Sequence, residues 1–220
     1  MSRRKQKPTL PQDPKKHRAL LLAVLSADGF HACALPLVRK LSGMSIREAP
    51  HYAGDHLAEV VVAATTLALS IELYLKALWM LAGDTPPDIH PLWALYKKLP
   101  PKLKTSIQAA YQGLPPHPVG MAAGVAFDLA PVGNSTPSQT SSTEKSLRAV
   151  LIRSSDVFVT WRYFHQVPTP GRPSRLAFEF FQLDAIANIL KAHTAQALGG
   201  YVVTAPGART NPMPLPSSAH

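Results

Sequence analysis

Residues 67–99 read LALSIELYLKALWMLAGDTPPDIHPLWALYKKL, and this stretch decides the fold. Large apolar residues recur in it at steps of three and four, which places them on one face of a helix: Leu67, Ile71, Leu75 and Leu78. Gly83 and the prolines behind it end that helix, and Pro91 suits the first turn of another. The pattern predicts one helix over about 55–81, a short loop and a second helix over 91–99.

The same stretch also contains polar residues at positions that suggest specific contacts. Glu72 precedes Lys76 by four residues, the order that favours an ion pair along an exposed helix. His90 stands directly before the second helix, where a side chain caps backbone amides. Further along, residues 154–166 read SSDVFVTWRYFHQ and bring an aromatic, basic and histidine group into one short segment.

The order of these segments, ELYLKAL, a loop, HPLWALYKKL and then WRY, resembles the HEPN family of small all-helical domains. The resemblance implies an all-α fold, a mostly antiparallel bundle of about five helices. It also implies binding of RNA or a nucleotide ligand, a homodimer, and a cytoplasmic role in a stress, defence or toxin–antitoxin setting. The positions that carry the resemblance are the candidate ligand-binding residues: Glu72, Lys76, His90, Trp161 and Tyr163.

Ribonucleases of that family resemble one another in an arginine followed four to six residues later by a histidine, paired across a dimer. Here the candidate catalytic residues, Arg162 and His165, are three residues apart, which departs from that spacing. On one helical face they would supply a cation to hold a phosphate and a base to deprotonate a ribose hydroxyl, without a metal ion. The structural alternative packs Trp161 and Tyr163 in the bundle and pairs Arg162 with a carboxylate such as Glu72.

The charge distribution favours an anionic partner. The net charge is +10, and the first 18 residues carry +6 of it. A basic arm before a mildly basic body favours nucleic acid, whereas the plainer interpretation is a tail that aids solubility. Cys33 is the single cysteine, so no intrachain disulfide can form, and it is expected to be a small buried residue. The sequence predicts no metal site and no cofactor.

The predicted organisation is one helical domain between two loose ends. A disordered basic arm covers 1–17, the domain covers 18–198 with a flexible insertion at 114–143, and a disordered tail covers 199–220. Further helices are expected at 18–41 with a weak point at Pro36, at 101–113, at 144–165 and from Arg175 to the glycines at 199–200. The buried residues expected in the first of these are Leu21, Leu25, Leu37 and Leu41.

The N-terminal region imitates a signal peptide. A basic stretch precedes the apolar segment ALLLAVLSA at 19–27, and residues 32–34 have a small-x-small form. Polar residues between 28 and 31 interrupt the approach to that site, so the alternative makes this segment the first helix of the bundle. The apolar run at 60–71 is shorter than the roughly twenty residues of a spanning helix, so no transmembrane segment and no membrane partner are expected.

A second hypothesis comes from another functional class. In it the basic arm and the apolar part of the insertion recruit a partner protein to a non-catalytic helical interaction module. Affinity for nucleic acid that falls steeply with salt separates the two hypotheses, because phosphate contacts release counterions.

Overall fold

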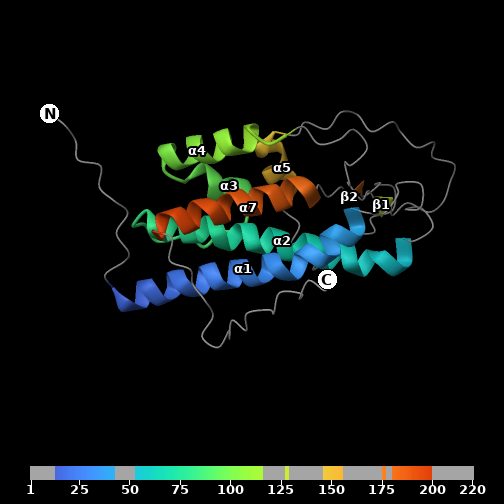
Figure 1. Cartoon of the computed structure of the whole chain (residues 1–220), viewed down its shortest axis with the longest axis horizontal. Coiled ribbons are helices and arrows are strands. Elements are labelled where there is room, and N and C mark those ends of the chain that lie inside the picture. Colours follow the sequence, from blue (N-terminus) through green and yellow to red (C-terminus); the bar gives the residue numbers. More distant parts are fainter. Residues whose placement is uncertain are drawn as a thin grey trace, which may run out of the picture.

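Six helices form the part of the chain that this computed structural model describes, residues 13–42, 53–115, 127–128, 146–155, 175–176 and 180–199. Three are long: α1 (Pro14–Ser42), α2 (Ala53–Leu81) and α7 (Phe180–Ala197). Three are short: α3 (Leu92–Lys97), α4 (Pro101–Gln112) and α5 (Leu147–Arg153). The short helices lie away from α1, on the other side of α2 and α7 (Figure 1). The predicted all-α fold is confirmed.

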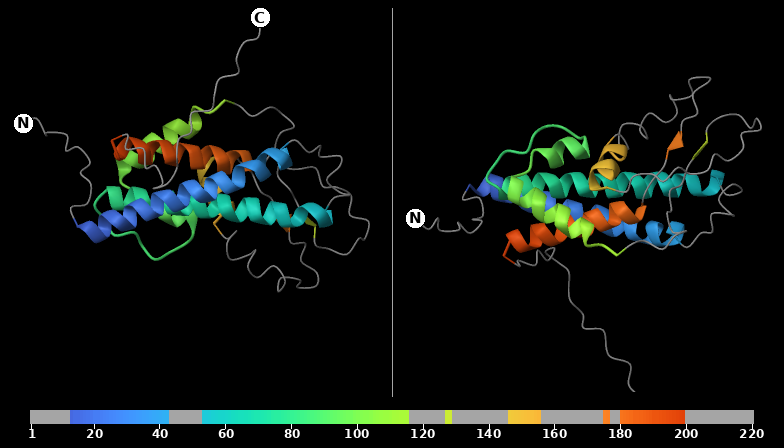
Figure 2. Two further views of the ribbon diagram at one scale, coloured as in Figure 1. Left: turned by 60° about the horizontal axis from the view of Figure 1, so that its bottom comes forward. Right: turned by 90° about the horizontal axis from the view of Figure 1, so that it is seen from above.

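The long helices set the direction of the bundle. α1 packs along α2 over most of its length and touches α7 more briefly. Both neighbours run antiparallel to α1, as the views in Figure 1 and Figure 2 show. Polar contacts fix this direction, because Ser70 on α2 reaches Ala27 on α1 while Lys40 near the end of α1 reaches Glu59 near the start of α2. The prediction of a mostly antiparallel bundle therefore holds for the two helix pairs that α1 forms, with α2 and with α7.

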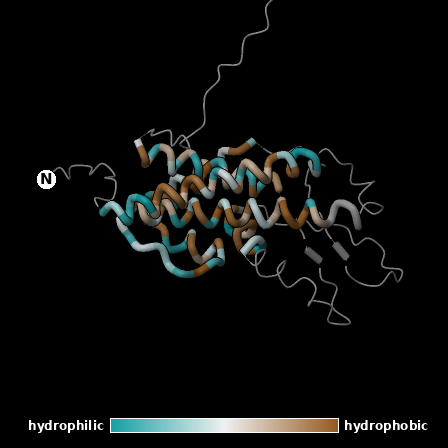
Figure 3. Tube along the Cα trace, turned by 90° about the horizontal axis from the view of Figure 1, so that it is seen from below, coloured by the Kyte–Doolittle hydropathy of each residue, from teal (hydrophilic) through white to brown (hydrophobic). Residues whose placement is uncertain are grey.

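The core follows the apolar stripe of α2. Four residues of the stripe that was predicted to face inward are at most 1% exposed: Leu67, Ile71, Leu75 and Leu78. Hydrophobic segments run along the long helices in Figure 3, and hydrophilic residues gather near their ends. Gly83, with a positive φ of 90°, follows the end of α2, and Gly113 follows the end of α4, as predicted. Pro101 occupies the first turn of α4.

The first helix differs from the prediction in its start and in its buried face. It begins at Pro14 rather than at residue 18, because the Asp13 carboxylate accepts a hydrogen bond from Lys15 N at 2.9 Å and Pro14 suits a first turn. Residues 14–17, predicted as part of a disordered arm, are therefore helical. The helix continues through Pro36, and it buries a set that excludes Leu21 and Leu25: Leu20, Val24, Ala27, His31, Ala34 and Val38. Cys33 is exposed, so its predicted burial is wrong.

Two further boundaries differ. The helix predicted over 144–165 is helical over Leu147–Arg153 and turns at Ser154 and Ser155, where the Ser155 hydroxyl donates to Leu151 O and competes with the backbone. Arg175–Leu176, predicted as helix, forms strand β2, which pairs antiparallel with β1 (Phe127–Asp128). Because β1 belongs to the distant predicted insertion, no local pattern could indicate this pairing. The rest of the insertion, apart from 114–115, and the tail beyond 199 lie outside the described residues.

Candidate functional site

Three of the predicted ligand-binding residues come together at one carboxylate oxygen. Glu72 Oε1 lies 2.8 Å from Lys76 Nζ and 3.0 Å from His90 Nδ1. An ionised carboxylate only accepts, so both nitrogens donate to it. Glu72 is 6% exposed and the side chain of Lys76 is 18% exposed, so the pair is largely removed from solvent, unlike the exposed pair that the helical spacing predicted. The contact ties the loop that carries His90 to the middle of the bundle.

That loop leads directly into α3, and the turn after α5 contacts the first turn of α3 through Ser155. The backbone N–H of Trp93 donates to Ser155 Oγ at 3.3 Å, and this hydroxyl donates in turn to Leu151 O at 2.6 Å. The amides of a first helical turn have no acceptor within their own helix. Ser155 supplies one from a segment more than fifty residues away in sequence, so Glu72 and Ser155 together determine where Trp93 lies.

In the first turns of α3, Trp93 and Tyr96 form an aromatic stack, and the guanidinium of Arg148 lies over the Trp93 ring. The rings of Trp93 and Tyr96 are stacked with their centroids 5.4 Å apart, and Arg148 on α5 places its guanidinium carbon 5.9 Å from the Trp93 ring centroid. The buried Tyr96 hydroxyl donates to Lys104 O at 3.0 Å, and burial raises the pKa of this tyrosine. Trp93 is half-buried and Arg148 is exposed, so the cation is the part of the stack that faces solvent.

The short helices and the turns that join them, residues 89–115 and 146–155, are named the cap here. The cap contains six basic residues and no acidic residue: Lys97, Lys98, Lys102, Lys104, Arg148 and Arg153. Lys97, Lys98, Lys102 and Arg148 are exposed, and Lys104 donates to Lys97 O at 2.9 Å, which joins α3 to α4. Two exposed carboxylates, Asp84 and Asp88, precede the cap in the loop after α2. The cap surface is therefore strongly basic around one aromatic stack.

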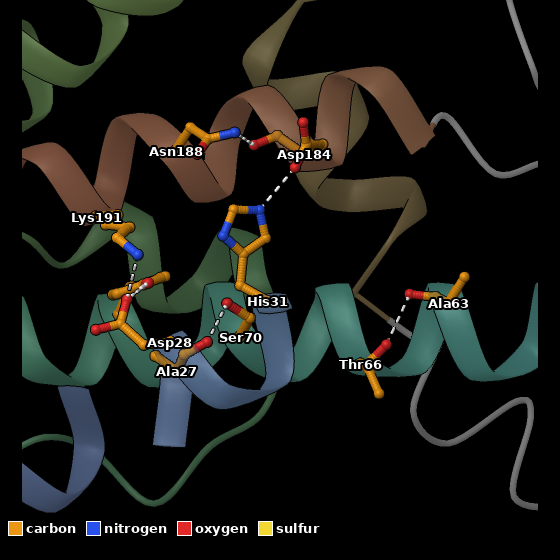
Figure 4. Close-up of polar contacts among 10 residues, drawn as sticks. Ala27, Asp28, His31, Ala63, Thr66, Ser70, Asp184, Asn188 and Lys191 are labelled. Atoms are coloured by element: carbon orange, nitrogen blue, oxygen red, sulfur yellow. Dashed lines mark hydrogen bonds and ion pairs between the residues drawn. The ribbon is translucent and has the colours of Figure 1, made fainter. Parts of the chain in front are cut away.

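A second polar cluster lies where α1 meets α7, and sequence reasoning missed it. His31 Nε2 lies 2.6 Å from Asp184 Oδ1, and Lys191 Nζ lies 2.8 Å from Asp28 Oδ1. Figure 4 shows His31 pointing from α1 toward Asp184 and Lys191 reaching down from α7 to Asp28. His31 is 4% exposed, whereas the side chain of Lys191 is 50% exposed. The contact between these two antiparallel helices is thus made by two polar pairs, here called the α1–α7 seam.

Helix α2 closes the seam from the core side. The Tyr74 hydroxyl donates to the same Asp28 oxygen that receives Lys191, and Ser70 donates to Ala27 O at 2.9 Å. Burial raises the pKa of Tyr74 far above its usual range, and the hydrogen bond and negative charge of Asp28 raise it further. Tyr74 is fully buried and stays a neutral donor. These contacts fit a structural role, because each charged group of the seam has a partner of opposite sign or a hydrogen-bond donor.

The remaining predicted site residues lie outside the described residues. They are Trp161, Tyr163, Arg162 and His165, so the structure does not bring them to Glu72, Lys76 and His90. The predicted pairing of Arg162 with Glu72 stays a prediction, and Glu72 already holds two cationic or donating partners. Within the described ranges, no group of three or more His, Cys, Asp or Glu side chains could hold a metal ion.

Two helices have the length and apolar composition of a membrane span. They are Pro14–Lys40, with 28% of its most apolar window buried, and Ala58–Leu81, with 56% buried. A buried core helix and a signal sequence share these properties, so the expected absence of a membrane segment stays a prediction. No family model, no curated protein sequence and no solved structure matches the chain.

Proposed function

We propose that this chain is an intracellular, HEPN-like protein that binds RNA or a nucleotide ligand, and that the cap is the binding surface. One observation carries the proposal: the cap has six basic residues and no acidic residue around the Trp93–Tyr96 stack. Lysine and arginine side chains supply the phosphate contacts of nucleic-acid binding, and aromatic rings supply stacking surfaces for unpaired bases. The +6 charge of the first 18 residues would add a second attraction to the same partner.

Glu72, Lys76 and His90 act in this proposal as positioning residues. Glu72 holds the loop before α3 through His90, and Lys76 neutralises the buried carboxylate. These three of the five residues that carry the resemblance would therefore fix the cap on α2 rather than contact the ligand first. His90 is the most exposed of them, with 56% of its side chain accessible, and it is the one able to contact a ligand directly.

Metal-independent cleavage of RNA is the further step of the proposal. Arg162 would hold the scissile phosphate, and His165 would take the proton of the ribose 2′-hydroxyl as its oxygen bonds to phosphorus and the bond from phosphorus to the 5′-oxygen breaks. The protonated histidine would then return the proton to that leaving oxygen. A histidine is suited to this because its ordinary pKa, about 6.5, lies near neutral pH. The support is the sequence alone, in which the two residues are three positions apart.

Binding and cleavage of a mixed RNA pool by the full chain test the proposal. The chain is compared with Arg162→Ala and His165→Ala at two salt concentrations and without added metal. We expect binding that weakens at the higher salt concentration. Cleavage lost in both variants would establish a ribonuclease, whereas binding without cleavage, unchanged in both variants, would leave a binding protein. Absence of salt-dependent binding would contradict the proposal.

A non-catalytic interaction module is the second candidate function, and one observation on α1 favours it. The exposed residues of α1 between Arg18 and Arg39 include no charged side chain: Ala19, Leu22, Ser26, Gly29, Ala32, Cys33 and Pro36. Leu22 is 54% exposed, and small residues allow a partner helix to approach closely. A second copy of the chain is the occupant proposed for this face, which would give a homodimer. Sedimentation equilibrium of the chain and of Ala32→Arg tests it, because a buried arginine would dissociate the dimer.

A further inference from the structure

We propose that Trp93, covered by Arg148, is a stacking site for one unpaired nucleobase, and that the cap therefore selects single-stranded over double-stranded RNA. This inference rests on the proposed function, and it adds the class of RNA and the contact that distinguishes it. The geometric basis is the juxtaposition of the Trp93–Tyr96 stack, the exposed Arg148 guanidinium and the exposed lysines of α3 and α4.

The Trp93–Tyr96 stack is held in place by its neighbours, which suits a surface on which a nucleobase stacks. Tyr96, 5% exposed, fills the interior side and is fixed by its hydrogen bond to Lys104 O. Trp93 is held at its backbone by Ser155 and packs against the hydrophobic core. A ring held by a buried neighbour and by its own backbone loses little side-chain freedom when a ligand binds, which favours binding. Arg148 is the accessible component, because it is exposed, and its contact among the described residues is with this ring.

A nucleobase can replace or share the position of Arg148. An exposed cation–π contact corresponds to about a twofold to fivefold change in an equilibrium constant. Stacking of a base on an aromatic side chain corresponds to about a fivefold to hundredfold change. The exchange therefore favours the base, and the displaced guanidinium is released next to a polyanion, where it forms charge-assisted contacts with phosphate oxygens.

The surrounding charges fit a sugar–phosphate backbone that leaves this position. Lys97 and Lys98 end α3 one turn beyond Trp93, and Lys102 lies in the first turn of α4. All three are exposed. A single strand can place one base on Trp93 and its phosphates along these lysines. In a duplex the bases are stacked and paired with one another, so a duplex can reach the lysines but cannot offer a base to the ring.

Affinities for a single-stranded RNA and for a duplex of the same sequence, at one salt concentration, test the inference. The chain is compared with Trp93→Leu and with a matched control, Trp79→Leu, which removes a half-buried tryptophan of α2 whose Nε1 donates to Leu95 O on α3, the helix that carries Trp93. We expect Trp93→Leu to weaken single-strand binding about tenfold and duplex binding less than twofold. The control is expected to change the two affinities by the same factor.

A fluorescence measurement keeps the test valid if Trp93→Leu does not fold. The chain has three tryptophans, so the difference in fluorescence between Trp79→Phe and Trp79→Phe/Trp93→Phe reports the Trp93 indole while Trp161 stays in place. Single-stranded RNA should quench this fluorescence, because a base stacks on the ring, and duplex RNA should not. Arg148→Gln, at an exposed position, should retain the quenching.

The outcomes separate the inference from the proposed function. Equal affinity for duplex and single strand, or salt-dependent binding without quenching of Trp93, would overturn the stacking site and leave a nucleic-acid-binding cap. No binding of either RNA by the unmodified chain would overturn both. Preferential single-strand binding that depends on Trp93 supports both.

Discussion

The His90 imidazole donates to the Glu72 carboxylate at 3.0 Å, although 18 positions separate the two residues. This contact joins the buried centre of α2 to the loop from which α3 begins. Because Trp93 follows His90 within one turn, the geometry of the basic cap depends on a carboxylate that lies beneath it. The buried ion pair of Glu72 with Lys76 and the surface chemistry of the cap are therefore parts of one arrangement.

Replacing Glu72 by alanine should destabilise the protein. Lys76, with 18% of its side chain exposed, would keep its charge without this partner, and His90 would lose this acceptor. Leaving a largely buried charged donor such as Lys76 without its acceptor costs about 1 to 3 kcal/mol of unfolding free energy. Denaturant titration of the chain and of Glu72→Ala measures it. Glu59→Ala is the matched control, because its partner Lys40 is 51% exposed, and it should cost less than about 1 kcal/mol. Equal losses in the two variants would contradict the positioning role.

The His31–Asp184 contact should show strong coupling in a double-mutant cycle. Its histidine is buried, so water screens the interaction little. We expect His31→Ala and Asp184→Ala to give a coupling energy of about 1 to 3 kcal/mol. The cycle for the exposed pair Lys40 and Glu59 should give less than about 1 kcal/mol. Indistinguishable coupling energies would mean that the seam does not hold α7 on α1.

Tyr74 should make the protein lose stability at alkaline pH. Burial, and then Asp28, raise the pKa of Tyr74 in the folded state, whereas in the unfolded chain it ionises near its ordinary value of about 10. Its contribution is fully present below pH 10 and declines above it by about 1.4 kcal/mol per pH unit. Tyr74→Phe should remove this component, so its unfolding free energy should fall less steeply between pH 10 and 11. Parallel curves for the two proteins would refute the assignment.

His193 should make the protein lose stability at acidic pH, because its pKa is shifted in the opposite direction from that of Tyr74. Burial lowers the pKa of His193 in the folded state, so the unfolded chain takes up this proton at a higher pH. The stability lost by this route begins below about pH 6.5 and grows as the pH falls toward the folded pKa. His193→Gln should flatten thermal stability between pH 6.5 and 5 and leave it similar at pH 8. An unchanged acid profile would show that another group is responsible.

The sequence was informative where a local period and a short loop decide the structure. The α2 stripe from Leu67 to Leu78 has one face that can be buried, and the break from Gly83 to Pro91 leaves little freedom in where His90 returns. Spacing could therefore pair Glu72 with Lys76, and the resemblance added His90. The burial of Glu72 could not be predicted, because it depends on the packing of α3 against α2.

Elsewhere several local patterns competed. The leucines at 20–22 give α1 an apolar residue on three neighbouring faces, so the periodicity did not distinguish Leu20 from Leu21, and the buried face was predicted wrongly. The seam was missed for the same reason. His31 faces Asp184 only when the correct face of α1 is turned inward, and Asp184 lies 153 positions further along the chain, on α7. The cap charge was visible in the sequence as single lysines, but the contact of Arg148 with Trp93 required the fold.

The salt dependence of RNA affinity tests the central claim, that the cap binds RNA, most directly. The slope of log Kobs against log salt for single-stranded RNA is measured for the chain, for Lys97→Gln/Lys98→Gln/Lys102→Gln, and for a control of equal charge on α1 and α7, Arg39→Gln/Lys40→Gln/Lys191→Gln, at exposed positions outside the cap and the first 18 residues. Each phosphate contact contributes about 0.7 to the slope for a single strand, so the cap variant should lose about 2 units of slope. The control should lose much less. Equal slopes for the chain and the cap variant would contradict the account.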